Sequence, residues 1–137
     1  MGIVDTLAKD FDHEIIEEFA GHYTLMCDEM EGLMLGLEKE NLYARNVGEL
    51  FRIFHNIKSA SGFLHLHRMN TLSELAESIF EEARVKQGPA TAEFVNWLLV
   101  IKDQFDKWRI DIEYNHDDLA TINPKIITIP VKITLDS

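Results

Sequence analysis

The 137-residue sequence is poor in basic residues and in cysteine. It holds 13 Lys and Arg against 24 Asp and Glu, which gives a formal net charge of −11 at pH 7. A chain with this balance lacks the basic face that phosphate backbones and anionic lipids require, so we expect neither nucleic acid nor a membrane as a partner. The single cysteine, Cys27, cannot form a disulfide within the chain and fits a reducing compartment.

Several other patterns are missing from the sequence. No apolar stretch is long enough to span a membrane, and residues 1–10 lack the apolar core of a signal peptide, so we expect a cytoplasmic protein. There is no Gly-rich phosphate loop, no cysteine pair and no Ser-His-Asp pattern. His65 and His67 resemble a pair of metal ligands, but residues two apart on a helix do not face each other, and we expect no metal site.

The sequence does have four long stretches in which apolar residues recur at spacings of three and four. They run from Asp12 to about Glu40, from Asn46 to about Leu66, from residues 70 or 71 to before Gly88-Pro89, and from Thr91 to about Ile112. In the first stretch the expected core stripe is Ile15, Phe19, His22, Met26, Leu33 and Leu37, and in the last it is Phe94, Leu98, Ile101, Phe105, Trp108 and Ile112. The pattern predicts an all-α domain over residues 1–116, in which a short helix within residues 3–10 precedes an antiparallel four-helix bundle.

The remaining segment, residues 117–137, changes character. Asn123-Pro124 ends the helical pattern, and apolar residues then alternate with other residues at a period of two, as in a strand. The alternating apolar residues are Ile127, Ile129, Val131, Ile133 and Leu135. We expect all five to point one way onto apolar surface, and two interpretations stay open. The tail is either an extended segment along the bundle or an edge strand that pairs with another chain, for example in a homodimer.

One histidine in the second stretch lies opposite its apolar stripe. At about 100° per residue, the apolar residues Ile53, Ile57, Ala60 and Leu64 fall within about 40° of the side opposite His55. The side of His55 carries Ser59 and Gly62, with Lys58 slightly further round the helix. The pattern therefore predicts an exposed imidazole beside a lysine, with small residues that leave room for the backbone of a partner.

Two apolar residues accompany this histidine on the helical projection. Phe51 lies about 40° from His55 and Leu66 about 20° from it. Apolar side chains next to a reactive histidine suit a docking patch, so we predict Phe51, Ser59, Gly62 and Leu66 as partner-binding residues. A surface histidine without a role is the simpler interpretation, but a glycine inside a helix costs about 1 kcal/mol relative to alanine, so Gly62 calls for a reason.

The segment His55-Asn-Ile-Lys58-Ser-Ala-Ser-Gly62 resembles the H-x-x-K-G-x-x-G signature of histidine-containing phosphotransfer (HPt) domains. It is most similar to the amino-terminal phosphotransfer domain of chemotaxis-type histidine kinases, and the similarity covers roughly residues 10 to 113. Two positions differ from the family pattern. Ser59 stands where glycine is usual, and His65 stands where a later glycine is common.

This resemblance implies a function and a set of site residues. His55 would be phosphorylated, Lys58 would balance the charge of the phosphoryl group, and Glu77 on the next helix would hydrogen-bond the non-reacting ring nitrogen. A histidine kinase and a response-regulator receiver domain would be the partners, with Mg²⁺ on the receiver and no cofactor on this chain. The protein would then be a phosphoryl carrier in a two-component phosphorelay and not a complete enzyme. The alternative is a helical adaptor that binds signalling partners without being phosphorylated.

Overall fold

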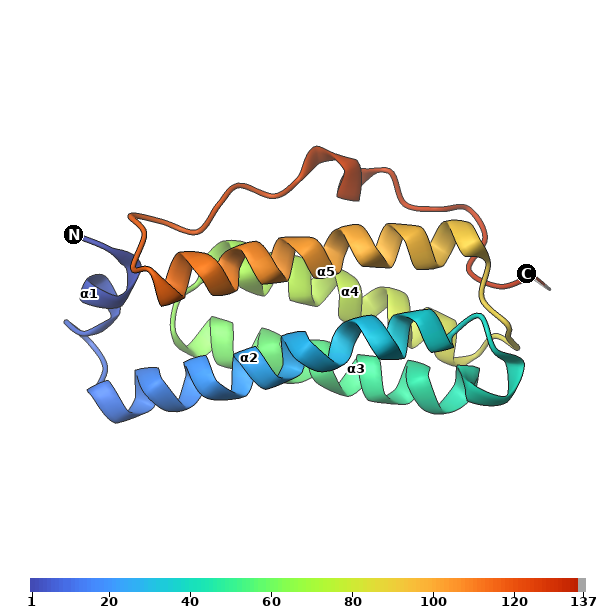
Figure 1. The fold of residues 1–137 in the computed structure, drawn as a ribbon, viewed down its shortest axis with the longest axis horizontal. Coiled ribbons are helices and arrows are strands. Elements are labelled where there is room, and N and C mark those ends of the chain that lie inside the picture. Colours follow the sequence, from blue (N-terminus) through green and yellow to red (C-terminus); the bar gives the residue numbers. More distant parts are fainter. Residues whose placement is uncertain (136–137) are drawn as a thin grey trace.

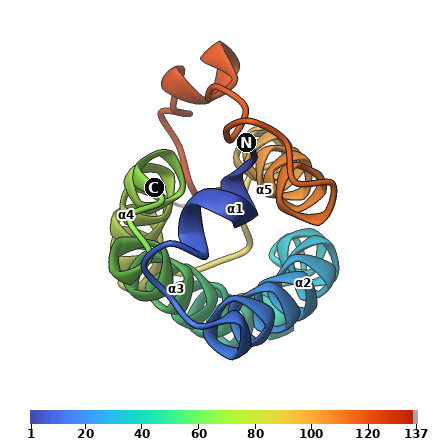
Figure 2. The same cartoon turned by 90° about the vertical axis from the view of Figure 1, so that its left-hand side faces the viewer.

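The computed structural model describes residues 1–135, and within them it is helical (Figure 1). The elements are α1 (Ile3–Leu7), α2 (His13–Gly36), α3 (Glu40–Phe63), α4 (His67–Arg84), α5 (Ala92–Glu113) and the 3-10 helix η1 (Pro124–Ile127). Helices α2 to α5 run antiparallel to their neighbours along the chain, and α1 lies across one end of them (Figure 2). The predicted all-α four-helix bundle with a short N-terminal helix is confirmed.

The core is formed by one face of each long helix. On α5 the predicted stripe is correct, since all six of its residues are buried. On α2 the prediction was partly wrong, because Ile15 and His22 are exposed. The residues of α2 that face the core are Ile16, Phe19, Tyr23, Cys27, Met30 and Met34. The buried stripe therefore lies about one residue further along the helix than predicted.

The second and third predicted helices both begin earlier than their sequence signals indicated. Helix α3 starts at Glu40, so Asn46 is not a cap but a buried residue whose Nδ2 donates to the Leu33 carbonyl oxygen at 3.0 Å. Helix α4 starts at His67 instead of residues 70 or 71. Thr91 does cap α5, and its side chain accepts a hydrogen bond from the Phe94 N–H at 3.0 Å.

After α5 the chain turns back and runs along that helix to the opposite end of the bundle (Figure 1). Two tryptophans of α5 hold it there: Trp108 Nε1 donates to the Ala120 carbonyl oxygen at 2.7 Å, and Trp97 Nε1 donates to that of Ile126 at 3.0 Å. Ala90 and Thr134 form an isolated antiparallel bridge. Up to residue 135 the tail is thus a segment that packs along its own bundle, and residues 136–137 lie outside the described residues.

The predicted alternating face of the tail was wrong. Of its five residues only Ile133 is buried, whereas Ile127, Ile129, Val131 and Leu135 are exposed. Ile126, which would point to the opposite side of a strand, is buried instead. Ile127, the first of the alternating residues, is the last residue of the 3-10 helix that begins at Pro124, so the segment is not a continuous strand with a period of two.

Candidate functional site

The predicted histidine of α3 faces a carboxylate on α4. His55 Nδ1 lies 3.1 Å from Glu77 Oε2, and Lys58 Nζ donates to the other carboxylate oxygen, Oε1, at 3.0 Å. The His55 side chain is 52% exposed. A neutral imidazole that donates its Nδ1 proton to Glu77 carries its lone pair on Nε2. The geometry therefore orients the ring and leaves Nε2 as the nucleophilic nitrogen.

The carboxyl of Glu77 is held in its ionised form. Burial of this group acts to raise its pKa, but the hydrogen bonds from Lys58 and His55, together with the positive charge of Lys58, outweigh burial and bring the pKa of Glu77 below its usual range. An ionised carboxylate stabilises positive charge on the neighbouring ring. Bond formation at Nε2 places such charge on the imidazole, so Glu77 favours that step.

The ring of His55 also has an aromatic neighbour. Phe51 lies one turn earlier on α3. The centre of its ring is 6.3 Å from the centre of the imidazole, and the two rings are nearly parallel, at an interplanar angle of 9°. The guanidinium of Arg84, at the end of α4, lies 4.1 Å from the centre of the Phe51 ring. Phe51 is therefore beside His55 as predicted, but Arg84 covers part of the apolar surface that we expected a partner to contact.

Gly62 has a structural reason that the sequence did not reveal. A Cβ atom at this position would lie 3.1 Å from Nδ2 of Asn70, which donates to the Lys58 carbonyl oxygen at 2.8 Å. The glycine thus makes room for a side chain of α4 that binds the backbone of α3 beneath the site. Ser59 and Gly62 are both exposed, as predicted.

Leu66 is not part of this surface. Helix α3 ends at Phe63, and His65 then takes a positive φ of 61°, so the helical projection does not extend to residue 66. Leu66 turns inward and is only 8% exposed. The prediction of Leu66 as a partner-binding residue was wrong, because it assumed that the helix continued through this turn.

A comparison with family models now bears on this site. The model described as Hpt domain matches residues 23–113, more than half of the chain. The chain belongs to the Hpt domain family. Hpt domains carry phosphoryl groups in phosphorelays, and His55, Lys58 and Glu77 all lie within the matched range. No curated protein and no solved structure matches the chain.

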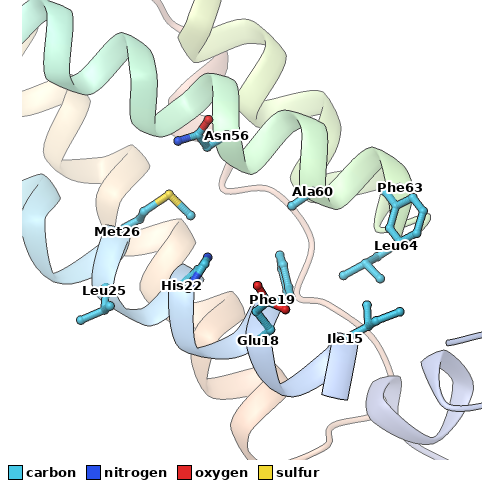
Figure 3. A pocket seen from close by; sticks show the side chains of 10 residues that line it. All are labelled: Ile15, Glu18, Phe19, His22, Leu25, Met26, Asn56, Ala60, Phe63 and Leu64. Carbon is cyan, nitrogen blue, oxygen red and sulfur yellow. The ribbon is translucent and has the colours of Figure 1, made fainter. Parts of the chain in front are cut away.

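A groove lies between α2 and α3 of this Hpt domain, on the face next to that of His55. It has a volume of about 470 Å³, and Asn56, the residue after His55, is part of its wall (Figure 3). Most of its lining is apolar, and the other lining residues are Ile15, Glu18, Phe19, His22, Leu25, Met26, Ala60, Phe63 and Leu64. Ile15, Leu25 and Phe63 are exposed. Ile15 and His22, the two members of the predicted core stripe that are exposed, line this groove instead.

Within residues 1–135 no three His, Cys, Asp or Glu side chains are placed to hold a metal ion together. No helix in the same range has the length and hydropathy needed to cross a membrane.

The sequence analysis missed the contributions of Arg84 and Asn70 to the surroundings of His55, because both depend on how α4 packs against α3.

Proposed function

We propose that this Hpt domain accepts a phosphoryl group on Nε2 of His55 and exchanges it with the aspartate of a response-regulator receiver domain. The observation that carries the proposal is the pairing of His55 Nδ1 with Glu77 at 3.1 Å, in a side chain that is otherwise half exposed. It supplies the two things that a phosphoryl-accepting histidine needs, a fixed tautomer and a reachable second nitrogen.

The transfer then follows from the charges around the ring. The Nε2 lone pair attacks phosphorus, the P–O bond to the receiver aspartate breaks, and its electron pair stays with the carboxylate that leaves. Glu77 offsets the positive charge that develops on the imidazole. Lys58 helps to keep Glu77 ionised, and we propose that its partly exposed ammonium also balances the charge of the bound phosphoryl group.

We further propose that the required Mg²⁺ is held by the receiver and that ATP is used by a separate histidine kinase. On this proposal the chain is a carrier whose chemistry is completed by its partners, and it is not an enzyme by itself.

The groove between α2 and α3 supports a docking face for the receiver beside His55. Exposed apolar side chains next to a reactive group are typical of protein contact surfaces. We expect Leu25→Glu, in the groove, to slow transfer from a phosphorylated receiver. Leu35→Glu is the matched control, because Leu35 is also exposed on α2 but does not line the groove. Equal rates for the two variants would exclude the groove from the docking face.

The decisive experiment is phosphorylation by a kinase or a phosphorylated receiver of a two-component system. We expect label that is stable to base and labile to acid, as a phosphohistidine is, and that is absent from His55→Gln. An adaptor that binds a receiver without being phosphorylated would give a complex but no such label. That result would overturn the proposed function.

A further inference from the structure

A second histidine of this chain has surroundings of the same kind as His55. His116 follows the end of α5, and its Nδ1 lies 2.7 Å from Oδ1 of Asp111. Lys107 Nζ donates to that same oxygen at 2.6 Å. The ring of Tyr114 lies 6.2 Å from the imidazole at an interplanar angle of 23°.

The two sites match part by part. Each has an imidazole whose Nδ1 pairs with a carboxylate, a lysine that donates to the same carboxylate, and an aromatic ring whose centre lies 6.2 or 6.3 Å from that of the imidazole. The exposed fractions of the two histidines are also similar, at 52% for His55 and 45% for His116. A neutral His116 that donates its Nδ1 proton to Asp111 carries its lone pair on the other nitrogen, Nε2.

The carboxylate of the second site is the more firmly held of the two. Asp111 is only 2% exposed, and its Oδ2 accepts a hydrogen bond from the Ala120 N–H at 2.8 Å. Burial acts to raise the pKa of Asp111, but the hydrogen bonds from Lys107, His116 and Ala120 outweigh it, so the pKa lies below its usual range. Asp111 is therefore a fixed negative charge at Nδ1 of His116.

The backbone of His116 is fixed as well. Its N–H donates to the Asp111 carbonyl oxygen at 2.8 Å, and its own carbonyl oxygen accepts from the Ile3 N–H at 2.8 Å. The residue is thus tied to α5 on one side and to α1 on the other. Such a ring does not have to be ordered before it reacts, which is what distinguishes it from a freely rotating surface histidine.

We propose that His116 is a second nucleophilic histidine, which accepts a phosphoryl group on Nε2 from a small phosphoryl donor of the phosphoramidate class. The Nε2 lone pair forms the new N–P bond while the P–N bond of the donor, whose nitrogen is protonated, breaks, and ammonia leaves with the electron pair of that bond. The proton on Nδ1 stays on the ring, hydrogen-bonded to Asp111, which offsets the positive charge that the ring gains.

The charges near His116 indicate a small donor and not a receiver domain. Asp117 and Asp118 follow it directly, and although Asp118 pairs with Arg68 at 2.9 Å, the loop remains acidic. The phosphorylated pocket of a receiver is itself acidic and would be repelled over its whole contact with this loop, whereas a small donor carries only the charge of its own phosphoryl group and needs access only to the imidazole, whose side chain is 45% exposed. This inference concerns a separate histidine and does not depend on the function proposed for His55.

Chemical phosphorylation of His55→Gln tests the proposal. The protein is incubated with phosphoramidate, and the labelled histidines and ring nitrogens are identified by mass spectrometry and ³¹P NMR. His13 is the internal control, because it is the more exposed of the two and pairs with Glu17 through Nε2, at 2.9 Å, instead of through Nδ1. We expect His116 to be labelled on Nε2 about tenfold faster than His13, because the exposed carboxylate of Glu17 orients its ring weakly, whereas the buried carboxylate of Asp111 holds the His116 ring firmly.

Two further variants in the His55→Gln background check the origin of the effect. His116→Gln should remove the label assigned to residue 116, while His13 is labelled at the same rate as before. Asp111→Asn should lower the rate at His116 about tenfold, again without a change at His13. Labelling of His116 no faster than His13 would overturn the proposal, and that comparison is made within one chain and needs no substitution at the buried Asp111.

Discussion

The orienting role of Glu77 gives the sharpest prediction about the site. Glu77→Ala removes the acceptor that lies 3.1 Å from His55 Nδ1 and leaves Lys58 without its carboxylate partner. Loss of a hydrogen bond to a charged group costs about 1–3 kcal/mol, which corresponds to a rate of phosphorylation at His55 lower by about tenfold to a hundredfold. The rate is measured as acid-labile, base-stable label per unit time, with helix content followed by circular dichroism.

A neighbouring glutamate provides the control. Glu74 lies one turn before Glu77 on α4 and is exposed, so Glu74→Ala removes the same negative charge without touching the ring. We expect Glu74→Ala to phosphorylate at close to the rate of the unmodified protein. Glu77→Gln should fall between the two, because its amide oxygen can still accept from Nδ1 but carries no charge. Unchanged kinetics in Glu77→Ala, with helix content intact, would refute the orienting role.

Three further predictions concern stability, pH and assembly. Leu66→Ala should destabilise the bundle by about 2–4 kcal/mol in urea unfolding, because a buried leucine is replaced by a cavity, while an unchanged midpoint would contradict its burial. The pKa values of Glu77 and Asp111 are lowered on folding from 4.5 and 3.8, so their contribution to stability is complete above these values and is lost as pH falls through the folded pKa values. The urea concentration at the unfolding midpoint should therefore decrease as the pH is lowered below about 4.5, and this decrease should be less steep in Glu77→Gln. An equally steep decrease in the two proteins would argue against the ion pair. If exposed residues of the tail pair two copies, Val131→Glu should convert a dimer to a monomer in sedimentation velocity without lowering Tm, since Val131 is 98% exposed, and a monomeric unmodified protein would exclude this contact.

The sequence was sufficient for the bundle and for the position of His55 in it. Apolar residues at spacings of three and four identify the helices, and the helical projection places His55 opposite Ile53 and Ile57, which are buried in the structure. Glu77 could be assigned only through the family resemblance. Whether its carboxylate reaches His55 depends on the packing of α4 against α3, and no local pattern encodes it.

The errors have physical causes that one sequence does not display. On α2 two neighbouring apolar rows exist, one with Ile15 and one with Ile16, and only the positions of α3 and α5 decide which is covered. At the end of α3 the residue that takes the positive φ is His65, where a glycine would have marked the end of the helix in the sequence. In the tail a single 3-10 turn changes which side chains face the bundle.

The contacts of the tail place both tryptophans of the protein beneath one segment. Trp97 and Trp108 are the two indoles in the sequence, and each donates its N–H to a carbonyl oxygen of the tail. Release of this segment would expose both indole nitrogens to water while the helices stay folded. Intrinsic fluorescence therefore serves as a built-in reporter of tail docking, and far-ultraviolet circular dichroism reports the bundle separately. A shift of emission that precedes the loss of ellipticity on heating would measure how tightly the last part of the chain is attached.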